Sequence, residues 1–227
     1  MKHLIITGSS GGLGIELLKH FLDKDFDFLY AVGNQKKFLE FDIKSPKLKY
    51  IFDLNLTEEN DLEKLFSYIN LSSEDELFII HCIGGYTGGK KFYEYDKNEL
   101  LEMFNKNFVT AYLVSKQAVN KIKNSKGGSI VFFSSSIALE YISGRSVYTI
   151  SKYALHHLIK IIEKEAKEFN FTANIIAPTI ILTEENRKWV NPSDSQNYVE
   201  PVEIAEMIEN IFLNYQKING NIFTITS

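Results

Sequence analysis

Short apolar runs alternate with longer amphipathic segments along most of the chain. The run HLIIT at 3–7 leads into a glycine-rich turn, and the segment GLGIELLKHFL after it carries apolar residues at helical spacing. The alternation continues toward the C-terminus. It predicts seven strands, at 3–7, 26–32, 48–54, 76–83, 128–135, 171–178 and 220–226. It also predicts helices at 12–22, 58–69, 97–123, 147–168 and 201–214.

The predicted strands are almost continuously apolar, and most are separated by helices. This arrangement is typical of a parallel sheet that helices cover on both faces. We therefore expect an α/β fold: a single Rossmann-like domain over 1–227, with a doubly wound seven-stranded parallel sheet and right-handed crossovers. Thr57 is the expected N-cap of the helix at 58–69, and Pro201 the expected first-turn residue of the last helix. Ligands of such sheets bind at the carboxyl ends of the strands.

Composition narrows the function classes. Of the 227 residues, 44% are hydrophobic and 24% charged, which suits one globular domain. The net charge of −4 and the lack of a long basic tract argue against a nucleic-acid partner. No apolar run approaches the ~20 residues of a membrane span, and the N-terminal run is too short for a signal peptide. The single cysteine, Cys82, excludes an intramolecular disulfide, argues against a cysteine-based metal site and fits a cytoplasmic location.

A glycine-rich loop, TGSSGGLG at 7–14, joins the first strand to the first helix. Gly8 permits a tight turn, Gly12 lets the backbone approach a pyrophosphate, and Gly14 lets the helix pack closely on the sheet. Free N–H groups at the helix start suit phosphate oxygens. The spacing T-G-x-x-x-G-x-G differs from both G-x-G-x-x-G and a Walker loop. We interpret the loop as a dinucleotide-binding turn.

A second motif lies in VYTISKYAL at 147–155. Tyr148 and Lys152 are four residues apart, so they share one face of the predicted helix. Such pairs are common and carry little weight alone. This pair, however, follows the Ser-rich end of the strand at 128–135, and it occurs in a chain that already has a cofactor-type loop.

Together these motifs resemble the short-chain dehydrogenase/reductase family, and the resemblance covers nearly the whole chain. Ser135 lies 13 residues before Tyr148, the family's common spacing, and Asn107 matches the asparagine of its catalytic tetrad. The resemblance implies a catalytic set of Asn107, Ser135, Tyr148 and Lys152. It implies cofactor contacts at Thr7, Gly8, Ser10, Gly12, Leu13, Gly14, Asn34, Asp53, Leu54, Gly84, Tyr148, Lys152, Pro178 and Thr183, and no metal.

Two of these contacts rest on further stretches that are similar to family segments. Asp53, in FDLNLT, looks like the aspartate that touches the adenine. The stretch NIIAPTIILT at 174–183 looks like the segment that closes over the nicotinamide, with Thr183 at the carboxamide-binding position. The resemblance therefore extends from the first strand to the segment after the sixth.

The chemistry suits the roles that the resemblance implies. Reduction of a ketone by hydride needs a proton for the developing alkoxide, and a free tyrosine, with a pKa of ~10, donates poorly near neutrality. The Lys152 ammonium would lower the pKa of Tyr148 and let it act as general acid/base. Ser135 would orient the substrate oxygen, and Asn107 would link Lys152 to a water chain. The serines on either side of Ser135 remain rivals, because spacing alone favours Ser135.

Two stretches depart from the family pattern. The sequence HCIGG at 81–85 stands where the family has Asn-Asn-Ala-Gly, although Gly84 keeps the close approach to the cofactor. We interpret His81 as a packed or hydrogen-bonded core residue rather than a catalyst. Pro178-Thr179 replaces Pro-Gly, and Thr179 restricts the backbone beside the nicotinamide. Neither change removes a catalytic group.

The end of the second strand indicates which nicotinamide cofactor is used. An acidic residue there would bind the ribose 2′-hydroxyl and select NAD. The stretch YAVGNQKK at 30–37 has no acid, and Asn34, Lys36 or Lys37 could meet a 2′-phosphate. Against this, the glycine loop lacks the basic residue before Gly12 that often accompanies NADP use. NADP(H) is therefore favoured over NAD(H).

The segment 184–198 is the expected substrate lid, and it is short and polar. Arg145, Arg187 and Lys188 could meet an anionic substrate, with ordinary surface charge as the alternative. We expect hydride transfer between nicotinamide and a carbonyl or secondary alcohol of a small polar substrate, such as a sugar derivative, with Tyr148 as general acid/base. A 3-oxoacyl-carrier-protein reductase is the alternative among enzymes. A non-catalytic NAD(P)-binding regulatory protein is the alternative from another class.

The resemblance also implies self-association. A homodimer or homotetramer would form through the long helices predicted at 97–123 and 147–168. The small-molecule substrate is the other expected partner, and neither nucleic acid nor a membrane is expected. The sequence does not name the substrate, the physiological direction or the number of subunits.

Overall fold

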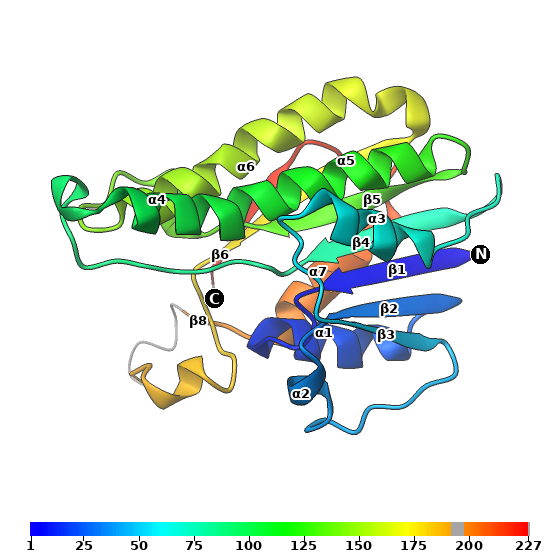
Figure 1. Cartoon of the computed structure of the whole chain (residues 1–227), viewed down its shortest axis with the longest axis horizontal. Coiled ribbons are helices and arrows are strands. Elements are labelled where there is room, and N and C mark those ends of the chain that lie inside the picture. Colours follow the sequence, from blue (N-terminus) through cyan, green and yellow to red (C-terminus); the bar gives the residue numbers. More distant parts are fainter. Residues whose placement is uncertain (192–197, 227) are drawn as a thin grey trace.

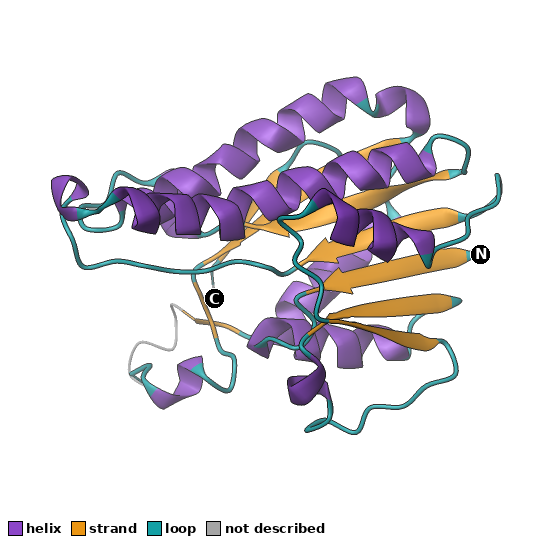
Figure 2. Cartoon of the chain, viewed as in Figure 1, coloured by secondary structure: helices purple, strands orange, loops and turns teal. Residues whose placement is uncertain are grey.

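A seven-stranded parallel sheet forms the centre of the fold. In the computed structural model, which describes residues 1–191 and 198–226, its strand order is β3-β2-β1-β4-β5-β6-β9. The predicted Rossmann-like α/β fold with a doubly wound parallel sheet is confirmed (Figure 2). The strands are β1 (Lys2–Thr7), β2 (Phe28–Gly33), β3 (Leu48–Phe52), β4 (Glu76–His81), β5 (Gly127–Phe133), β6 (Phe171–Pro178) and β9 (Ile222–Ile225).

Helices cover both faces of this sheet (Figure 1). One face packs against α1 (Gly12–Leu22) and α7 (Pro201–Leu213). The other packs against α3 (Glu59–Ser67), α5 (Thr110–Ile122) and α6 (Ser146–Glu165), and α4 (Lys97–Phe104) packs against α6. Each face has its own apolar core, and successive strand residues enter opposite cores.

Strand β1 shows why the predicted strands are apolar throughout. Leu4 and Ile6 enter the core under α1 and α7, while Ile5 enters the core under α3, α5 and α6. All three side chains are fully buried. Because successive side chains point to opposite faces, a strand covered on both faces must be apolar at every position.

The structure differs from the sequence prediction in the helix at 97–123. A π-helical turn at Asn105–Val109 separates α4 from α5. Such turns insert one residue into the helical ladder and are common at functional sites. The predicted N-cap Thr57 is wrong: Glu58 occupies the cap position, and the Thr57 hydroxyl donates to Asn55 Oδ1 at 2.8 Å. A bond to its own turn thus replaces the capping bond.

Several short elements were not predicted. Helix α2 (Gln35–Phe38) follows β2, and β7 (Ile180–Ile181) pairs with β8 (Tyr198–Val199) in a separate two-stranded parallel sheet. Each is too short to produce a periodic pattern in the sequence. Between β7 and β8 the chain carries residues 184–191 of the predicted lid, and lid residues 192–197 lie outside the described residues.

The strand order reverses beside β1, which pairs with β2 on one side and β4 on the other. The register places Thr7 next to Val32 and next to His81, so the segments that follow three strands emerge together. These segments include the glycine loop and the HCIGG stretch. The fold therefore brings the predicted cofactor motifs to one edge of the sheet, where ligands of doubly wound sheets bind.

Candidate active site

The Tyr148–Lys152 pair lies in the first turns of α6 and is buried. The Lys152 amine donates to the carbonyl oxygen of Phe133, the last residue of β5, at 2.8 Å. Burial lowers the pKa of Lys152 to about 8, so the amine still carries its charge at neutral pH. The hydrogen bond to the carbonyl oxygen of Phe133 holds this charge at the end of the sheet.

The phenol of Tyr148 differs from expectation. Its pKa is raised, because burial outweighs a hydrogen bond with Ser135 and the positive charge of Arg145, both of which lower it. Lys152 is not among the groups that lower it. The Lys152 amine is bonded to the carbonyl of Phe133 instead. Tyr148 is therefore protonated at neutral pH and suited to donating a proton.

The three neighbouring serines are distinguished by their partners. Ser134 is buried, and its hydroxyl is hydrogen-bonded to Nε2 of His156 at 2.8 Å. Ser136 begins a 3₁₀ turn, Ser136–Leu139. Ser135 is the serine whose side chain lies near enough to the phenol of Tyr148 to lower its pKa. Its proximity to Tyr148 sets it apart from its two neighbours.

Asn107 lies in the π-helical turn and is buried. Its Oδ1 accepts from the N–H of Gly85 at 2.8 Å, and its Nδ2 donates to Ser151 Oγ at 2.9 Å. A β-carbon on Gly84 would lie 2.9 Å from both Asn107 Oδ1 and Lys152 Nζ. The two tetrad members therefore flank Gly84, and glycine is the residue that leaves room for both.

His81 is the hydrogen-bonded core residue that the sequence indicated. Its ring lies between Thr7 Oγ1, at 2.8 Å from Nδ1, and Thr110 Oγ1, at 3.1 Å from Nε2. Thr110 donates its own proton to the carbonyl of Lys106, so Nε2 carries the ring proton and Nδ1 accepts from Thr7. Burial lowers the pKa of His81 to about 3 and keeps the ring neutral. Thr7 therefore braces the sheet through its side chain.

The glycine loop has the geometry that its sequence predicts. Gly8 has φ +71°, a conformation that favours glycine, and its carbonyl accepts from the N–H of Gly11 at 2.9 Å. A β-carbon on Gly14 would lie 2.3 Å from that carbonyl oxygen, so the helix packs directly on the turn. Leu13 is half-buried against the α1–α7 core.

The side chain of Ser10 reaches the end of β2. Its Oγ accepts from the N–H of Asn34 at 3.0 Å, and a β-carbon on Gly33 would lie 2.6 Å from it. Asn34 Oδ1 accepts from the N–H of Lys37 and so caps α2. Sequence reasoning missed this cap because α2 is a single turn. Helix α2 carries Lys36 and Lys37 at exposed positions beside the expected ribose site.

The remaining predicted cofactor contacts surround the same edge. Asp53 is exposed, has φ 53° and donates its N–H to the carbonyl of Gly33 at 3.2 Å, and Leu54 next to it is half-buried. Pro178 ends β6. A β-carbon on Gly12 would lie 3.0 Å from Cβ of Thr183, so the segment after β7 lies directly against the glycine loop.

These residues fit a dinucleotide. The cap residue of α1, Gly11, forms no side-chain cap, and the first turn has no acid, so its N–H groups are free to meet phosphate oxygens. The hydroxyl of Thr179, at the end of β6, is buried without a hydrogen-bond partner in the described part of the chain. Glycines at 8, 12, 14 and 84 keep side chains out of the edge.

A family model described as short chain dehydrogenase matches residues 2–194. The chain belongs to the short-chain dehydrogenase/reductase family. It is therefore an oxidoreductase, and the family binds a nicotinamide cofactor.

Three distant curated relatives of this short-chain dehydrogenase are reductases. A dihydropteridine reductase from Dictyostelium discoideum is 25% identical over 209 residues, covering 91% of this chain and 86% of the relative. An NADPH-dependent aldehyde reductase-like protein from Arabidopsis thaliana is 27% identical over 196 residues, covering 79% and 72%. A 3-oxoacyl-[acyl-carrier-protein] reductase, FabG, from Rickettsia typhi is 24% identical, covering 90% and 82%.

Solved structures show the same fold. ElxO with NADP bound has a TM-score of 0.85 at 20% identity, covering 99% of this chain and 96% of its own. A 4-hydroxyisoleucine dehydrogenase complexed with NADH has a TM-score of 0.82 at 22% identity, covering 99% and 97%.

A cavity of about 520 Å³ lies beside the glycine loop of this dehydrogenase. Its lining includes the loop, α1 and the described start of the predicted lid, and none of the tetrad. Arg187 and Lys188 line it, and Arg187 forms an ion pair with Glu200. Of the three cations expected near the substrate, Arg145 is the one whose charge acts on Tyr148.

Sequence reasoning missed one side chain next to the tetrad. The ring of Tyr86 packs edge-on against that of Tyr148, with centroids 4.9 Å apart, and its hydroxyl accepts from Arg145 Nε at 3.1 Å. The signal available in the sequence was its position, directly after HCIGG.

The described residues lack two features of other protein classes. No cluster of three or more His, Cys, Asp or Glu there could hold a metal ion. None of the helices in these ranges is long and apolar enough to cross a membrane.

Proposed function

We propose that the chain is an NADP(H)-dependent carbonyl reductase or alcohol dehydrogenase that acts on a small polar substrate, with Tyr148 as general acid/base. The observation that carries the proposal is the convergence of Ser135, Tyr148 and Lys152 at the carboxyl edge of the sheet, beside a glycine loop built for a dinucleotide. These residue types supply what carbonyl reduction needs besides hydride: a bond to the oxygen and a proton.

The nicotinamide, when bound, supplies or accepts the hydride. The Ser135 hydroxyl binds the substrate oxygen, and Tyr148 donates its phenolic proton to that oxygen as negative charge develops. Burial keeps Tyr148 protonated until this point. The closeness of Ser135 to Tyr148 supports the proposal that both hydroxyls bind one substrate oxygen.

Lys152 and Asn107 prepare Tyr148 for the next proton. Lys152 carries its positive charge one helical turn from Tyr148, and its bond to the carbonyl of Phe133 fixes the end of β5 beside the phenol. Asn107, fixed by Gly85 and Ser151, holds the π-helical turn beside Lys152. In this proposal a water chain from solvent reaches the Lys152 amine beside Asn107. The proton returns along this route.

The end of β2 supports NADP(H) over NAD(H). No carboxylate follows β2 at Gly33 and Asn34, where an acid would bind the ribose 2′-hydroxyl. Lys36 and Lys37 are exposed nearby and form no ion pair with any described residue, so both are free to meet a 2′-phosphate. The NADP-bound relative structure is consistent with this choice, while the NADH-bound one makes the direct comparison necessary.

The proposed function is tested with Tyr148→Phe, which removes the proton and keeps the ring. Turnover should fall by about 10²–10⁴-fold, because the general acid is lost. Binding of NADPH, followed by nicotinamide fluorescence, should not change. Wild-type turnover rates in the variant would overturn the role of Tyr148.

A parallel titration of the wild type with NADPH and NADH tests the cofactor. Tighter binding of NADPH is expected from the lysines of α2. Tighter binding of NADH would overturn the preference, and binding of neither would overturn the role of the glycine loop.

One alternative substrate class is supported by a relative. The match to a 3-oxoacyl-[acyl-carrier-protein] reductase favours a carrier-bound acyl substrate. Turnover of an acyl-carrier substrate above that of free small ketones would select it. A non-catalytic regulatory role is disfavoured by the complete set of Asn107, Ser135, Tyr148 and Lys152.

We also propose a homodimer or homotetramer through α5 and α6. Apolar side chains are exposed on these helices, namely Tyr112, Ile150, Tyr153 and Ile161. Such a set favours a covered face. Sedimentation of the protein as a monomer at micromolar concentration would contradict this.

A further inference from the structure

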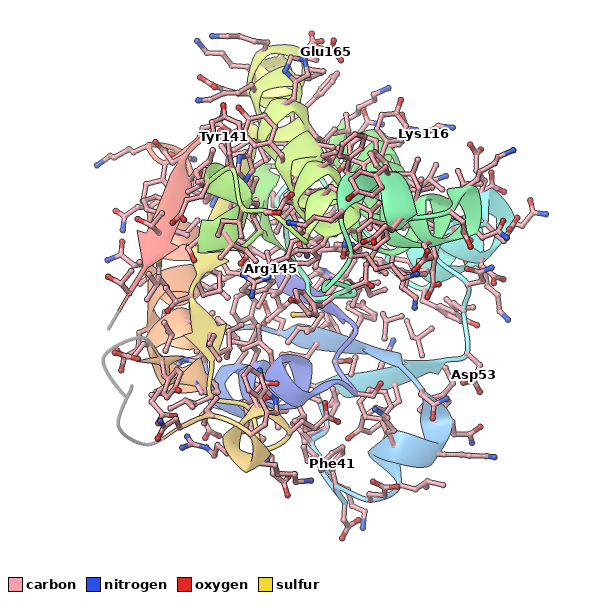
Figure 3. All side chains as sticks on the ribbon, turned by 90° about the vertical axis from the view of Figure 1, so that its left-hand side faces the viewer. Phe41, Asp53, Lys116, Tyr141, Arg145 and Glu165 are labelled. Atoms are coloured by element: carbon pink, nitrogen blue, oxygen red, sulfur yellow. The ribbon has the colours of Figure 1, made fainter. Side chains whose placement is uncertain are left out.

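Arg145 occupies a distinctive place at the start of α6, three residues before Tyr148. Its Nε donates to the hydroxyl of Tyr86 at 3.1 Å, and the Tyr86 ring packs edge-on against Tyr148. The guanidinium lowers the pKa of Tyr148 by its charge. Arg145, Tyr86 and Tyr148 are thus one contiguous cluster that ends at the proposed catalytic proton. Figure 3 shows Arg145 near the middle of this side of the molecule.

Two loops are joined to hold this cluster. The N–H of Gly89 donates to the carbonyl of Gly144 at 2.8 Å, and the hydroxyl of Tyr95 donates to the same carbonyl at 3.3 Å. The amine of Lys91 donates to Ser143 Oγ at 3.1 Å. The loop that carries Tyr86 and the loop that ends at Arg145 therefore form one wall.

The charge of Arg145 is not balanced by this wall. No carboxylate of the described residues forms an ion pair with Arg145, whereas nearby Lys90 pairs with Glu99 and Lys106 pairs with Glu102. Arg145 is partly buried. A partly desolvated cation without an anion is an arrangement that proteins usually complete with a counter-charge.

The helix behind Arg145 adds to the positive potential. The first turn of α6 has no acidic residue and no side-chain cap. The hydroxyl oxygen of Ser146 is buried without a partner among the described residues. Both features favour negative charge at this end of α6. They add to the effect of the Arg145 charge beside Tyr86.

We propose that Arg145 and Tyr86 bind a carboxylate or phosphate group of the substrate, which places the substrate among anionic ketones or hydroxy compounds. This inference rests on the proposed function, since it assigns the substrate class of the same site. The Nε of Arg145 donates to the Tyr86 hydroxyl, so the two terminal nitrogens of the guanidinium remain free to donate two parallel hydrogen bonds to the anion. The Tyr86 hydroxyl accepts from Arg145 and has its own proton to donate to the same anion.

The exposure of the two residues fits this role. Tyr86 is 60% exposed, so an incoming substrate reaches its hydroxyl, while Tyr148 behind it is buried. The anion would be held at the entrance and the carbonyl carried inward to Tyr148. Arg187 forms an ion pair with Glu200, whereas no described carboxylate forms an ion pair with Arg145, which is therefore available to a substrate.

The test compares matched substrates in four proteins: wild type, Arg145→Gln, Arg145→Lys and Tyr86→Phe. Acetoacetate is compared with methyl acetoacetate, and dihydroxyacetone phosphate with dihydroxyacetone. The wild type should prefer the anionic member of at least one pair by about tenfold or more in kcat/KM. Arg145→Gln should remove that preference mainly through KM, and Arg145→Lys should restore part of it. The preference is measured as the ratio of kcat/KM for the anionic and the neutral member, so that any change in the pKa of Tyr148 affects both members and cancels.

The two pairs also distinguish a carboxylate from a phosphate. Equal rates for neutral and anionic members in the wild type, or a preference that survives Arg145→Gln, would overturn the proposal. Lys116→Gln is the matched control, because it removes one positive charge from α5, where Lys116 pairs with Glu59. In Figure 3, Lys116 lies well apart from Arg145.

A binding measurement covers the case in which neither ketone pair is turned over. The NADPH complex is titrated with malonate and with inorganic phosphate by calorimetry. Binding of one anion that Arg145→Gln abolishes and Lys116→Gln retains would support the proposal. No binding of either anion, or equal binding in both variants, would overturn it. Failure of wild type to bind NADPH or NADH would instead count against the proposed function.

Discussion

Polar side chains differ between two regions of the site. We call the buried residues His81, Asn107 and Lys152 with their surroundings the base, and the region of Arg145 and Lys37 the rim. At the base, His81, Asn107 and Lys152 each have fixed partners in the chain: two threonines, Gly85 with Ser151, and the carbonyl of Phe133. At the rim, Arg145 and Lys37 carry charges that no described carboxylate neutralises.

The difference has a physical cause. A buried polar group without a partner costs roughly 1–3 kcal/mol, so the three side chains of the base are held by partners within the fold. A charge at the rim keeps at least part of its water and remains available to a ligand. The base therefore determines geometry and protonation, whereas the rim determines which molecule enters. Substitutions at the base should change the chemistry or the stability, and substitutions at the rim should change affinity.

The largest expected effect separates two adjacent serines of the base. Ser135→Ala should lower kcat/KM by about 10²–10³-fold, because the hydrogen bond to the substrate oxygen is lost. Ser134→Ala should leave kcat/KM within a few-fold but lower the free energy of unfolding by about 1–3 kcal/mol, because His156 loses its partner. Steady-state kinetics and urea denaturation of both variants give the comparison. An activity loss in Ser134→Ala as large as that in Ser135→Ala would reject this division of roles.

A smaller effect should follow from pH at His81. Its pKa in the folded protein is about 3, against 6.5 for an ordinary histidine. Below pH 6.5 the unfolded chain therefore binds a proton that the folded chain does not, so stability falls as pH falls. His81 alone should lower the free energy of unfolding by about 2 kcal/mol between pH 7 and pH 5.

The variant His81→Asn isolates this contribution, since asparagine keeps both hydrogen-bonding functions and does not titrate. Urea denaturation at pH 7 and pH 5 should show a weaker pH dependence in the variant than in the wild type. The same dependence in both proteins would mean that other groups, such as the buried His156, carry it.

The smallest expected effect lies at the rim. Replacing Lys36 and Lys37 together with alanine should weaken NADPH binding about tenfold and leave NADH binding unchanged, because the lysines meet only the 2′-phosphate. Parallel fluorescence titrations measure both affinities. Equal losses for the two cofactors would show that the lysines act on the whole dinucleotide, and the base of the site should be untouched in either case.

Much of the fold could be predicted from hydrophobic periodicity, because strands covered on both faces must be apolar and helices must show one apolar stripe. The π-helical turn at Asn105–Val109 could not, since one extra residue within a helix leaves the pattern on either side intact. The one-turn helix α2 and the two-residue strands β7 and β8 are too short to show a period. Residue type alone predicts Thr57 as the cap, but its hydroxyl donates to a nearer partner, the Oδ1 of Asn55.

The candidate site, like the fold, could be predicted only in part from the sequence. The positions of Tyr148, Lys152, Ser135 and the glycine loop follow from spacing, because i,i+4 residues share a helix face and a strand–turn–helix loop faces the sheet edge. The pKa of Tyr148 does not follow, since burial and not the nearest lysine dominates it.

By itself, the sequence determined the alternation of elements, the glycine loop and the residue types available for catalysis, since these depend on local spacing. The tertiary structure decided which partners those residues have: Ser134 with His156, His81 between Thr7 and Thr110, and Arg145 with Tyr86. The Arg145–Tyr86 pair joins residues 59 positions apart, and the Thr7–His81 pair joins residues 74 apart. Desolvation and hydrogen bonding depend on such distant neighbours, so protonation states and the charge left free for a substrate emerge with the fold.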